Sequence, residues 1–319
     1  MRKVAVVTTG FFDGVHLGHR HVIETVVSSA RERGEEAIVV TFWPHPRTVL
    51  QQDAREFRLL TSLEEKKALL KAAGIDRVEV LPFTREFAAM KADEYLQMLR
   101  DRFGASLIVM GYDNRIGSDR RTASDLASAD TQVPVLVSEP LYLGPQGTKT
   151  QVSVSACHSE RSEESASAGP APTHADAISS TRIRIALEAG DVESANGMLG
   201  YSYGLYGVVV AGNRMGRTIG FPTANMQLYE PLKLVPLNGV YAVETEVLGR
   251  TFAGMCNIGI RPTVGGTART IETHILGFNE DIYGLPMRIR FVRRIRDERK
   301  FPSLDALREQ LIADAAVCR

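Results

Sequence analysis

The sequence contains little cysteine, no excess charge of either sign and no long apolar run. Its three cysteines, Cys157, Cys256 and Cys318, lie far apart and form no CxxC pair, which argues against a disulfide framework and a thiolate metal site. Lys plus Arg equals Asp plus Glu at 38 each, so no global charge attracts nucleic acid or an anionic membrane surface. The apolar run near the basic N-terminus is far too short for a signal sequence or a membrane span. These absences favour small-molecule chemistry in the cytoplasm.

The 319 residues are enough for two hydrophobic cores. In the first part, β-branched runs alternate with helical apolar spacing, which predicts a parallel sheet with helices on both faces. From Leu205 the pattern changes to short alternating strands separated by glycine turns. This predicts a six-stranded β-barrel, followed by an amphipathic helix over 303–313 with Leu304, Leu307 and Leu311 on one stripe. The strands predicted in the first part are 4–7, 37–42, 78–81, 107–110 and 133–137, and its main helices are 19–33, 62–73 and 91–103.

Residues 146–177 interrupt this pattern, because they are rich in Ser, Ala, Pro and charge and nearly empty of large apolar residues. Such a composition predicts a disordered insertion or linker, since it offers too little apolar surface to join a core. A surface insertion without a role is the simplest interpretation, because long loops cost little closure entropy. We therefore predict a first domain at 1–185, which carries the insertion, and a second domain at 186–319.

The loop after the first predicted strand, TTGFFDGVHLGHRH, combines glycines with closely spaced histidines. His16 and His19 lie three residues apart where the next helix begins, so both imidazoles are expected at a helix N-terminus. Free N–H groups and the helix dipole favour an anion there, and imidazoles can donate hydrogen bonds to a phosphoryl group. The spacing matches neither a dinucleotide fingerprint nor a P-loop. A zinc site that adds His21 and a purely structural loop remain alternatives.

A second helix start follows at residues 178–184, ISSTRIR. Ser179, Ser180 and Thr181 offer hydroxyls and backbone N–H groups, and Arg184 supplies a cation one turn later. Such groups can clamp pyrophosphate. The alternative is an ordinary N-cap followed by a solvated arginine.

A glycine-rich loop opens the barrel region at residues 212–225, GNRMGRTIGFPTAN. Its glycines allow a phosphate backbone to come close, and its rigid Phe-Pro turn presents Thr223 and Asn225, whose oxygens suit magnesium. The loop therefore indicates a second ATP site. A hairpin loop with a buried turn is the structural alternative.

These segments resemble a known family. FFDGVHLGH resembles the HxGH signature of the nucleotidyltransferase superfamily, in the form carried by the adenylyltransferase half of prokaryotic bifunctional riboflavin kinase/FAD synthetases. TFWPHPR, GYDNRIG and ISSTRIR resemble three further segments of that half, although Asn114 and Ile116 stand where the family usually has Phe. GNRMGRTIGFPTAN, NGVYAV, NIGIRPTV, TIETHIL and DIYG resemble the riboflavin kinase domain in the same order. The resemblance implies an α/β protein with a Rossmann-like nucleotidyltransferase domain and a riboflavin-kinase β-barrel.

The resemblance also implies a cytoplasmic enzyme that phosphorylates riboflavin to FMN and adenylylates FMN to FAD, with ATP as co-substrate and Mg²⁺ as cofactor. It places a catalytic glutamate at Glu272, which we interpret as the acceptor of the riboflavin 5′-hydroxyl proton. A cross-strand charge partner is the alternative role for this residue. The rival functions are a flavin-binding regulatory or storage protein and a kinase with an inactive first domain.

The predicted site residues fall into three groups. The predicted catalytic residues are Glu272, His16, His19 and Arg184. The predicted ATP- and phosphate-binding residues are Gly10, Phe12, Asp13, Gly14, Gly18, Asp113, Ser179, Ser180, Thr181, Gly212, Gly216, Arg217, Gly220 and Pro222. The predicted magnesium ligands are Thr223 and Asn225.

Overall fold

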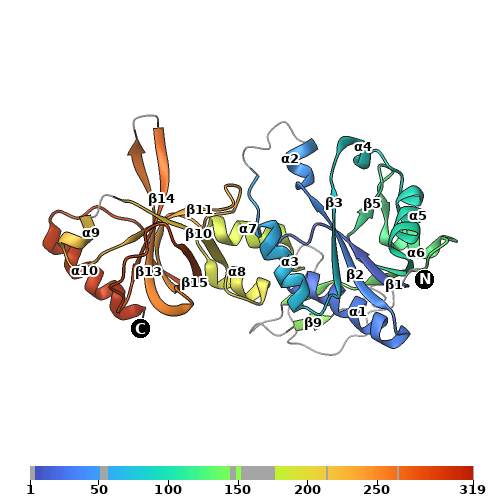
Figure 1. Cartoon of the computed structure of the whole chain (residues 1–319), viewed down its shortest axis with the longest axis horizontal. Helices are drawn as coiled ribbons and strands as arrows, with labels where there is room; N and C mark the ends of the chain where they lie inside the picture. Colours follow the sequence, from blue (N-terminus) through green and yellow to red (C-terminus); the bar gives the residue numbers. More distant parts are fainter. Residues whose placement is uncertain are drawn as a thin grey trace, which may run out of the picture. The chain divides into compact units, whose positions relative to one another are not determined.

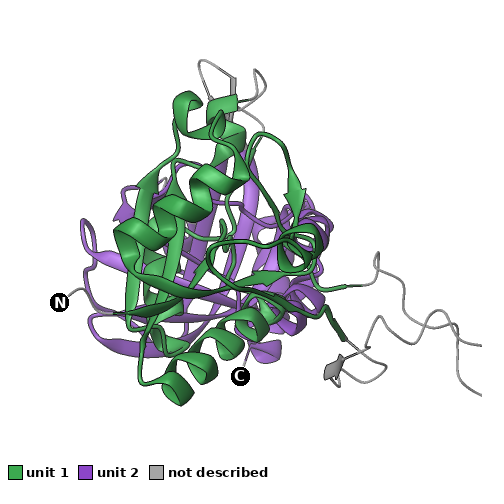
Figure 2. Cartoon of the chain, turned by 90° about the vertical axis from the view of Figure 1, so that its right-hand side faces the viewer, with its two compact units in different colours: residues 1–180 green, residues 181–319 purple. Residues whose placement is uncertain are grey.

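The chain divides into two compact units, residues 1–180 and 181–319, in a computed structural model (Figure 2). The structure describes residues 4–50, 57–143, 149–151, 177–212, 215–263 and 266–318. Most of the predicted insertion at 146–177 lies outside the described residues. The boundary predicted between residues 185 and 186 stays a prediction about where the two catalytic modules divide.

The first unit is built on a five-stranded parallel sheet in the order β3-β2-β1-β4-β7 (Figure 1). The order runs outward in both directions from the β1–β4 pair, which makes the sheet doubly wound and confirms the Rossmann-like prediction. Ligands of such sheets bind at the carboxyl ends of the strands where the order reverses. We therefore look for a site in the loops that follow β1 and β4. The strands are β1 (Ala5–Thr9), β2 (Glu36–Trp43), β3 (Arg77–Pro82), β4 (Ala105–Gly111) and β7 (Val135–Ser138).

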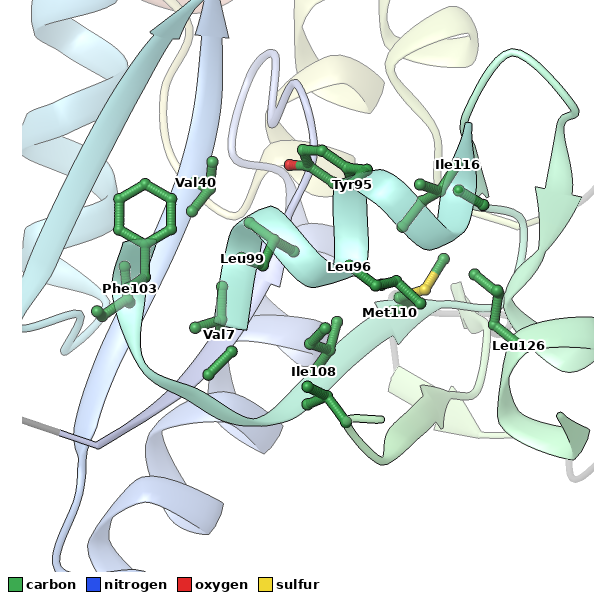
Figure 3. Packing of buried hydrophobic residues seen from close by; sticks show 14 of the residues in the cluster. Val7, Val40, Tyr95, Leu96, Leu99, Phe103, Ile108, Met110, Ile116 and Leu126 are labelled. Atoms are coloured by element: carbon green, nitrogen blue, oxygen red, sulfur yellow. The ribbon is translucent and has the colours of Figure 1, made fainter. Parts of the chain in front are cut away.

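Helices cover both faces of this sheet, because alternate residues of each strand point to opposite sides. Val6 packs in the core cluster that α1 and α3 cover, whereas Val7 packs in the cluster on the other face, against α5 and α6. Figure 3 shows the second cluster, where Leu99 of α5 packs above Ile108 of β4 and both side chains are fully buried. Each contributes about 1.5–3 kcal/mol of hydrophobic stabilisation. The helices are α1 (Leu17–Arg33), α3 (Leu63–Ala72), α5 (Ala92–Phe103) and α6 (Ala123–Ser128).

Local signals in the sequence set the ends of these helices. Ser62 caps α3 in a reciprocal capping box with Glu65, and α1 ends at Gly34, which adopts φ 66°. The long helices therefore begin and end close to the predicted positions. The smaller elements of the unit are α2 (Pro46–Leu50), α4 (Arg85–Ala88), the hairpin of β5 (Arg115–Ile116) with β6 (Arg121–Thr122), and the hairpin of β8 (Leu141–Leu143) with β9 (Lys149–Gln151).

The second unit contains a closed six-stranded antiparallel barrel in the order β10-β11-β14-β13-β12-β15 (Figure 1). Its interior is filled by large side chains such as Tyr241 and Phe291, whose ring centroids lie 5.2 Å apart. The predicted six-stranded barrel is confirmed. The strands are β10 (Gly204–Val210), β11 (Ala224–Leu228), β12 (Gly239–Val247), β13 (Arg250–Thr263), β14 (Gly266–Ile275) and β15 (Pro286–Arg296), and the helices are α7 (Ser180–Glu188), α8 (Val192–Leu199), α9 (Met215–Thr218) and α10 (Leu304–Val317).

The terminal helix α10 is longer than predicted and uses a different face. Leu311 packs with a small cluster that includes Met255, but Leu304 is 55% exposed, so the predicted leucine stripe was wrong at its first member. The buried face includes Asp314, whose carboxylate accepts hydrogen bonds from Arg296 of β15 at 2.7–3.2 Å. This ion pair, rather than the spacing of the leucines alone, fixes the face that meets the barrel.

Candidate active sites

The loop after β1 has a strained backbone. Phe12 (φ 47°), Gly14 (φ 87°) and Val15 (φ 38°) all adopt left-handed backbone conformations. A β-branched residue such as Val15 rarely adopts this conformation. The Phe12 and Val15 side chains are buried in the cluster under α1. Their burial offsets a backbone strain on the order of 1–3 kcal/mol per residue. At Gly10 a side chain would press on the Phe12 ring, which lies 3.3 Å from the position of a Cβ.

Asp13 ties this loop to the segment that leads into α3. Its carboxylate, 3% exposed, accepts hydrogen bonds from the backbone N–H groups of Leu60 and Thr61 at 3.0–3.1 Å and from the Thr61 hydroxyl at 3.2 Å. The same hydroxyl oxygen accepts the N–H of Gly14 at 3.1 Å. Asp13 therefore shapes the loop through these bonds, and its carboxylate faces backbone donors.

The two predicted catalytic histidines of the first unit lie together. The rings of His16 and His19 stack with centroids 3.6 Å apart and planes 16° apart, and Nδ1 of His16 accepts the backbone N–H of His19 as the N-cap of α1. Burial of the His19 ring, the adjacent His16 and the Lys66 ammonium lower the pKa of His19 well below its usual value. His19 is therefore a neutral imidazole at pH 7. Three His, Cys, Asp or Glu side chains that could hold a metal ion together do not occur among the described residues.

Part of the ISSTRIR segment reaches the same loop. Ser180 Oγ donates a hydrogen bond to the carbonyl oxygen of Asp13 at 2.8 Å. Gly18 lets residue 178 lie close to the histidine loop, because a Cβ at residue 18 would lie 3.2 Å from both the His16 ring and the carbonyl oxygen of Ile178. Ser179 directly precedes α7, and Thr181 and Arg184 lie on α7 within the second unit. The structure thus brings Ser180 to the histidine loop.

An aromatic pocket of about 320 Å³ lies at the carboxyl ends of β1, β2 and β3, and we call it the aromatic pocket. Phe42 packs against Phe11 at 5.2 Å and against Phe83 at 5.9 Å between ring centroids. Sequence analysis did not single out these residues, although phenylalanines near the ends of adjacent predicted strands could have indicated an aromatic pocket. The pocket is lined by Phe11, Phe42, Phe83, Phe87, Tyr95, Asn114 and Ile116, among others.

The loop after β4 supplies one wall of the aromatic pocket. Asn114 Nδ2 donates to the carbonyl oxygen of Thr9 at 3.2 Å, which joins this loop to the end of β1, whereas Asp113 is exposed. Asn114 and Ile116, the two departures from the family pattern, both line the pocket. The hydroxyls of Thr9 and Tyr95 lie 2.5 Å apart, and burial raises the pKa of Tyr95, so its hydroxyl stays protonated.

In the second unit, three predicted residues meet across two strands of the barrel. Asn225 of β11 and Glu272 of β14 are direct register partners, and the Thr223 hydroxyl donates to the Glu272 carboxylate at 3.4 Å. Gly212 lies so close that a Cβ there would approach the Asn225 amide nitrogen to 2.1 Å. A Cβ at Gly216 would approach the carbonyl oxygen of Phe221 to 2.2 Å. Glycine is therefore required at residue 216, where the contact is with backbone, whereas a side chain at residue 212 would displace the Asn225 amide.

The turn before Thr223 is fixed from the neighbouring strand. Nδ1 of His274 donates a hydrogen bond to the Pro222 carbonyl oxygen at 2.8 Å, and the ring of Phe221 packs 5.1 Å from the His274 ring. Gly220 takes φ 83° just ahead of this turn. Sequence analysis did not name His274, although its place two residues after Glu272 puts both on the same face of β14.

Thr223 separates two cavities of the second unit. The loop-side cavity, about 460 Å³, is lined by Arg217, Pro222 and Thr223 together with residues 278–283. The helix-side cavity, about 390 Å³, is lined by Thr223 and Glu272 together with apolar side chains that include Phe301 and Leu311. Thr223 therefore lies between two cavities that both carry charged side chains, since Arg296, Glu298 and Arg299 also line the helix-side cavity beside its apolar wall. Such an arrangement suits group transfer between two bound molecules.

No helix in the described ranges is long and apolar enough to cross a membrane. The family model for FAD synthetase matches residues 1–146, and the family model for riboflavin kinase matches residues 199–319. A bifunctional riboflavin kinase/FMN adenylyltransferase of Bacillus subtilis (strain 168) is 34% identical, over 97% of this chain and 90% of the relative. The protein of the same name from Escherichia coli (strain K12) is also 34% identical, over 98% and 91%. A crystal structure described as a macrolide-efflux protein from Streptococcus pneumoniae is 32% identical with a TM-score of 0.85, over 100% of this chain and 95% of that chain.

Proposed function

Because the chain belongs to the family of bifunctional riboflavin kinases/FMN adenylyltransferases, it is an enzyme of FAD synthesis, and we propose how its two units divide the two reactions. The second unit phosphorylates riboflavin to FMN, and the first adenylylates FMN to FAD. The observation that carries this division is the presence of a separate reactive cluster in each unit, His16 with His19 in one and Thr223 with Glu272 in the other. The proposed boundary between the modules remains 185/186.

In the kinase unit, the two cavities suggest where each substrate binds. The loop-side cavity carries Arg217 and suits the phosphates of ATP, because a guanidinium matches phosphate oxygens. The helix-side cavity, with Phe301 and Leu311, suits the isoalloxazine ring of riboflavin. Thr223 lines both cavities. The γ-phosphoryl group would then be transferred at this residue.

Glu272 is the proposed proton acceptor of the kinase reaction. It lines the helix-side cavity, and its carboxylate accepts a hydrogen bond from Thr223 at 3.4 Å. As the riboflavin 5′-hydroxyl attacks the γ-phosphorus, the Glu272 carboxylate takes the hydroxyl proton and ADP leaves. The same hydrogen bond orients the carboxylate toward the point where the two cavities meet.

The residues around Thr223 fit a magnesium ion. The Thr223 hydroxyl, the Asn225 amide oxygen and the Glu272 carboxylate are hard oxygen donors on adjacent strands, which is the ligand chemistry that Mg²⁺ prefers. When bound, the ion would neutralise charge on the ATP phosphates. We propose Thr223 and Asn225 as the residues that hold it, with Gly212 and Gly216 leaving room for the phosphates.

In the adenylyltransferase unit, the aromatic pocket suits the flavin of FMN and the histidine loop suits the ATP phosphates. An FMN phosphate oxygen attacks the α-phosphorus and pyrophosphate leaves, while His16 and His19 donate hydrogen bonds to the developing charge. The N-terminus of α1 adds its dipole. Ser180, Thr181 and Arg184 remain the proposed pyrophosphate clamp. The remaining proposed contacts are Gly10, Phe12, Gly14, Gly18, Asp113 and Ser179 in this unit and Gly220 and Pro222 in the other.

The balanced charge of the chain supports a cytoplasmic enzyme whose partners are riboflavin, FMN, FAD and ATP, with neither nucleic acid nor a membrane among them. The test is to incubate the purified protein with riboflavin, ATP and Mg²⁺ and to separate the flavins. We expect FMN followed by FAD. Accumulation of FMN alone would indicate an inactive first unit, and unchanged riboflavin would indicate a binding or storage protein.

A matched pair of variants tests the proposed metal ligands. Thr223→Ala and Asn225→Ala should raise the Mg²⁺ concentration needed for half-maximal riboflavin phosphorylation, because each removes an oxygen donor. Thr251→Ala, at an exposed position of strand β13 on the same barrel, is the control and should leave the magnesium dependence unchanged. Equal magnesium curves for all three variants would contradict the assignment.

A further inference from the structure

A buried hydroxyl group contacts the histidine loop from a distant part of the sequence. Thr61 directly precedes Ser62, the N-cap of α3, and its side chain is 2% exposed. The Thr61 hydroxyl donates a hydrogen bond to the Asp13 carboxylate at 3.2 Å and accepts the backbone N–H of Gly14 at 3.1 Å. The backbone N–H of Thr61 donates to the same carboxylate at 3.0 Å. Three hydrogen bonds of one residue therefore meet at two adjacent positions of the loop.

The two contacts of the Thr61 hydroxyl use both of its hydrogen-bonding capacities. A hydroxyl carries one proton to donate and lone pairs to accept, so a single group can bridge a carboxylate oxygen and an N–H donor. Valine has almost the same shape as threonine but can neither donate nor accept. Serine keeps the hydroxyl and lacks only the methyl group. Among side chains of this size, an alcohol is therefore what makes both bonds strongly.

These bonds act beside the strained part of the loop. Gly14 stands between Asp13 and Val15, and Val15 takes φ 38°. A strained backbone of this kind persists only where surrounding contacts over-determine it. After the strained residue, the Val15 carbonyl oxygen accepts a hydrogen bond from Arg20 at 3.3 Å. Before it, Thr61 holds the Asp13 side chain and the Gly14 N–H, so the turn is fixed on both sides.

His16 follows this turn directly. It is the N-cap of α1, where its Nδ1 accepts the backbone N–H of His19 at 3.2 Å. Its ring stacks on the His19 ring with centroids 3.6 Å apart. A change of backbone torsion at residues 13–14 would displace His16 and disturb this stack. The placement of both imidazoles at the N-terminus of α1 therefore depends on the backbone that Thr61 holds.

We propose that Thr61 is a positioning residue of the adenylyl-transfer site: its hydroxyl holds the turn before the stacked histidines, so that both imidazoles meet the ATP phosphates in the geometry that transfer requires. The Thr61 side chain is buried and uses both of its capacities within the protein, so it acts through the histidines rather than on a substrate. The inference rests on the proposed function of the histidine loop. Positioning of this kind stabilises the transition state more than the bound substrates, so it determines kcat rather than KM.

The first test compares two substitutions of Thr61 in FAD formation from FMN and ATP. Thr61→Val keeps the shape of the side chain and removes the hydroxyl. We expect kcat to fall by about tenfold to a hundredfold, since a misplacement of about 1 Å can cost about 10² in rate. KM for FMN and for ATP should stay close to the parent values. Thr61→Ser restores the hydroxyl and should return most of the parent kcat.

Thr8→Val is the matched control for Thr61→Val. Thr8 lies on β1 in the same unit and is fully buried, but within the described part of the chain its hydroxyl has no hydrogen-bond partner. Thr8→Val therefore removes a buried hydroxyl of the same kind without breaking a hydrogen bond. It should keep the parent kcat for FAD formation.

A double-mutant cycle with His19→Gln shows whether Thr61 acts through the histidines. In the His19→Gln background, Thr61→Val should lower kcat by a clearly smaller factor than in the parent enzyme, because one of the groups that Thr61 positions is gone. A role in stability alone gives the same factor in both backgrounds. The cycle is measured on FAD formation at saturating FMN and ATP.

The folding of the first unit can be followed separately in the whole chain. Trp43 on β2 is the only tryptophan of the sequence, so its fluorescence during a urea titration reports the unfolding of this unit. If Thr61→Val is not folded at the assay temperature, Thr61→Cys replaces it in both tests. A thiol is close to the hydroxyl in size but is a weak donor and a weak acceptor. Thr61→Cys should likewise lower kcat and leave KM unchanged.

The outcomes separate this inference from the proposed function. If the parent enzyme makes no FAD from FMN, the proposed function fails. If the parent makes FAD and the folded Thr61→Val or Thr61→Cys enzyme keeps the parent kcat, only the role of Thr61 fails. The role also fails if Thr61→Ser is as impaired as Thr61→Val, or if KM rises while kcat stays unchanged. An equal factor in the His19→Gln background overturns it as well.

Discussion

The two units present their reactive side chains from different kinds of backbone. In the first unit, His16 and His19 come from a loop and a helix start at the end of a parallel sheet. In the second, Asn225 and Glu272 face each other as register partners within a closed barrel. A loop at a strand end can hold strained residues such as Val15 because the sheet below stays unchanged. In a barrel, by contrast, a shift of one reactive residue also changes the pairing register of its strand with the neighbouring strands.

The comparison also explains where glycine is required. In the first unit, Gly14 takes a left-handed conformation at φ 87°. In the second, Gly212 and Gly216 lack this feature, and the close neighbours are the Asn225 amide at residue 212 and the Phe221 backbone at residue 216. Both loops therefore combine the two demands: the first adds close packing at Gly10 and Gly18, and the second adds a left-handed glycine at Gly220.

The largest effect should come from Glu272→Gln, which keeps the size of the side chain and removes proton acceptance. We expect riboflavin phosphorylation to fall by about 10²–10⁴, typical of a general base, while FMN supplied directly is still converted to FAD. Assays of both reactions on one preparation measure this. Glu246→Gln is the control, since Glu246 is a barrel carboxylate that pairs with Arg290 at 2.6 Å. If Glu272→Gln behaves like this control, Glu272 is only a strand charge partner.

The reciprocal change in the first unit should break FAD formation alone. His16→Asn retains a side chain that can cap α1, and His19→Gln retains hydrogen-bonding capacity, but each removes an imidazole. We expect FAD formation to fall by about 10²–10³, because each removes a donor to the transition state. Phosphorylation of riboflavin should persist, so FMN accumulates.

His21→Gln is the control for this pair of variants. His21 lies on α1 beyond the stacked histidines, and its loss should leave both reactions close to the parent rates. Loss of both activities in His16→Asn would contradict the separation of the two sites. Loss of FAD formation in His21→Gln would instead indicate a site made from His16, His19 and His21 together.

A smaller effect is expected on the stability of the second unit alone. Asp314→Asn breaks the buried ion pair with Arg296, which should lower the free energy of unfolding by about 3 kcal/mol. Riboflavin phosphorylation measured across a urea titration reports this loss. FAD formation from FMN, which reports the first unit, should be lost at the same urea concentration as in the parent enzyme. Asp305→Asn, at an exposed position of the same helix, should change stability by no more than about 0.5 kcal/mol. Equal effects of the two substitutions would show that the ion pair does not fix α10.

The smallest effect distinguishes the two kinds of glycine. Gly197 lies inside α8 with open space around a Cβ, so Gly197→Ala should raise the free energy of unfolding by about 0.5–1 kcal/mol. Gly200 ends the same helix at φ 74°, so Gly200→Ala should lower it by about 1 kcal/mol. Thermal unfolding of the two variants gives both signs. A change of the same sign in both would mean that the backbone at residue 200 is not held in the left-handed region.

Most of the fold could be predicted from local patterns. The five strands of the parallel sheet and the long helices α1, α3 and α5 match the predicted segments because their apolar periodicity and end signals are local. Strand β11 was not identified as a strand, since Ala224–Leu228 begins inside a glycine-rich motif. Leu304 was misplaced because the Arg296–Asp314 pair, which is distant in sequence, sets the orientation of α10.

The candidate sites could be predicted only in part. His16, His19, Thr223 and Glu272 carry their chemistry in short motifs, so the sequence indicated them. Lys66 belongs to no such motif, and the pattern of an ordinary amphipathic helix gives no sign that its side chain is buried. The aromatic pocket was missed for a related reason, because Phe11, Phe42 and Phe83 come from three separate strand ends.

By itself, the sequence determined the two cores, the order of their elements and the residue types that can bind phosphate and magnesium, because these depend on neighbours along the chain. Only the tertiary structure decided which groups share one environment. Stacking of His16 on His19, the saturation of the Asp13 carboxylate and the burial of Lys66 all depend on contacts between distant segments. Charge states follow from such contacts, since burial and neighbouring charges, rather than residue type, set a pKa inside a protein.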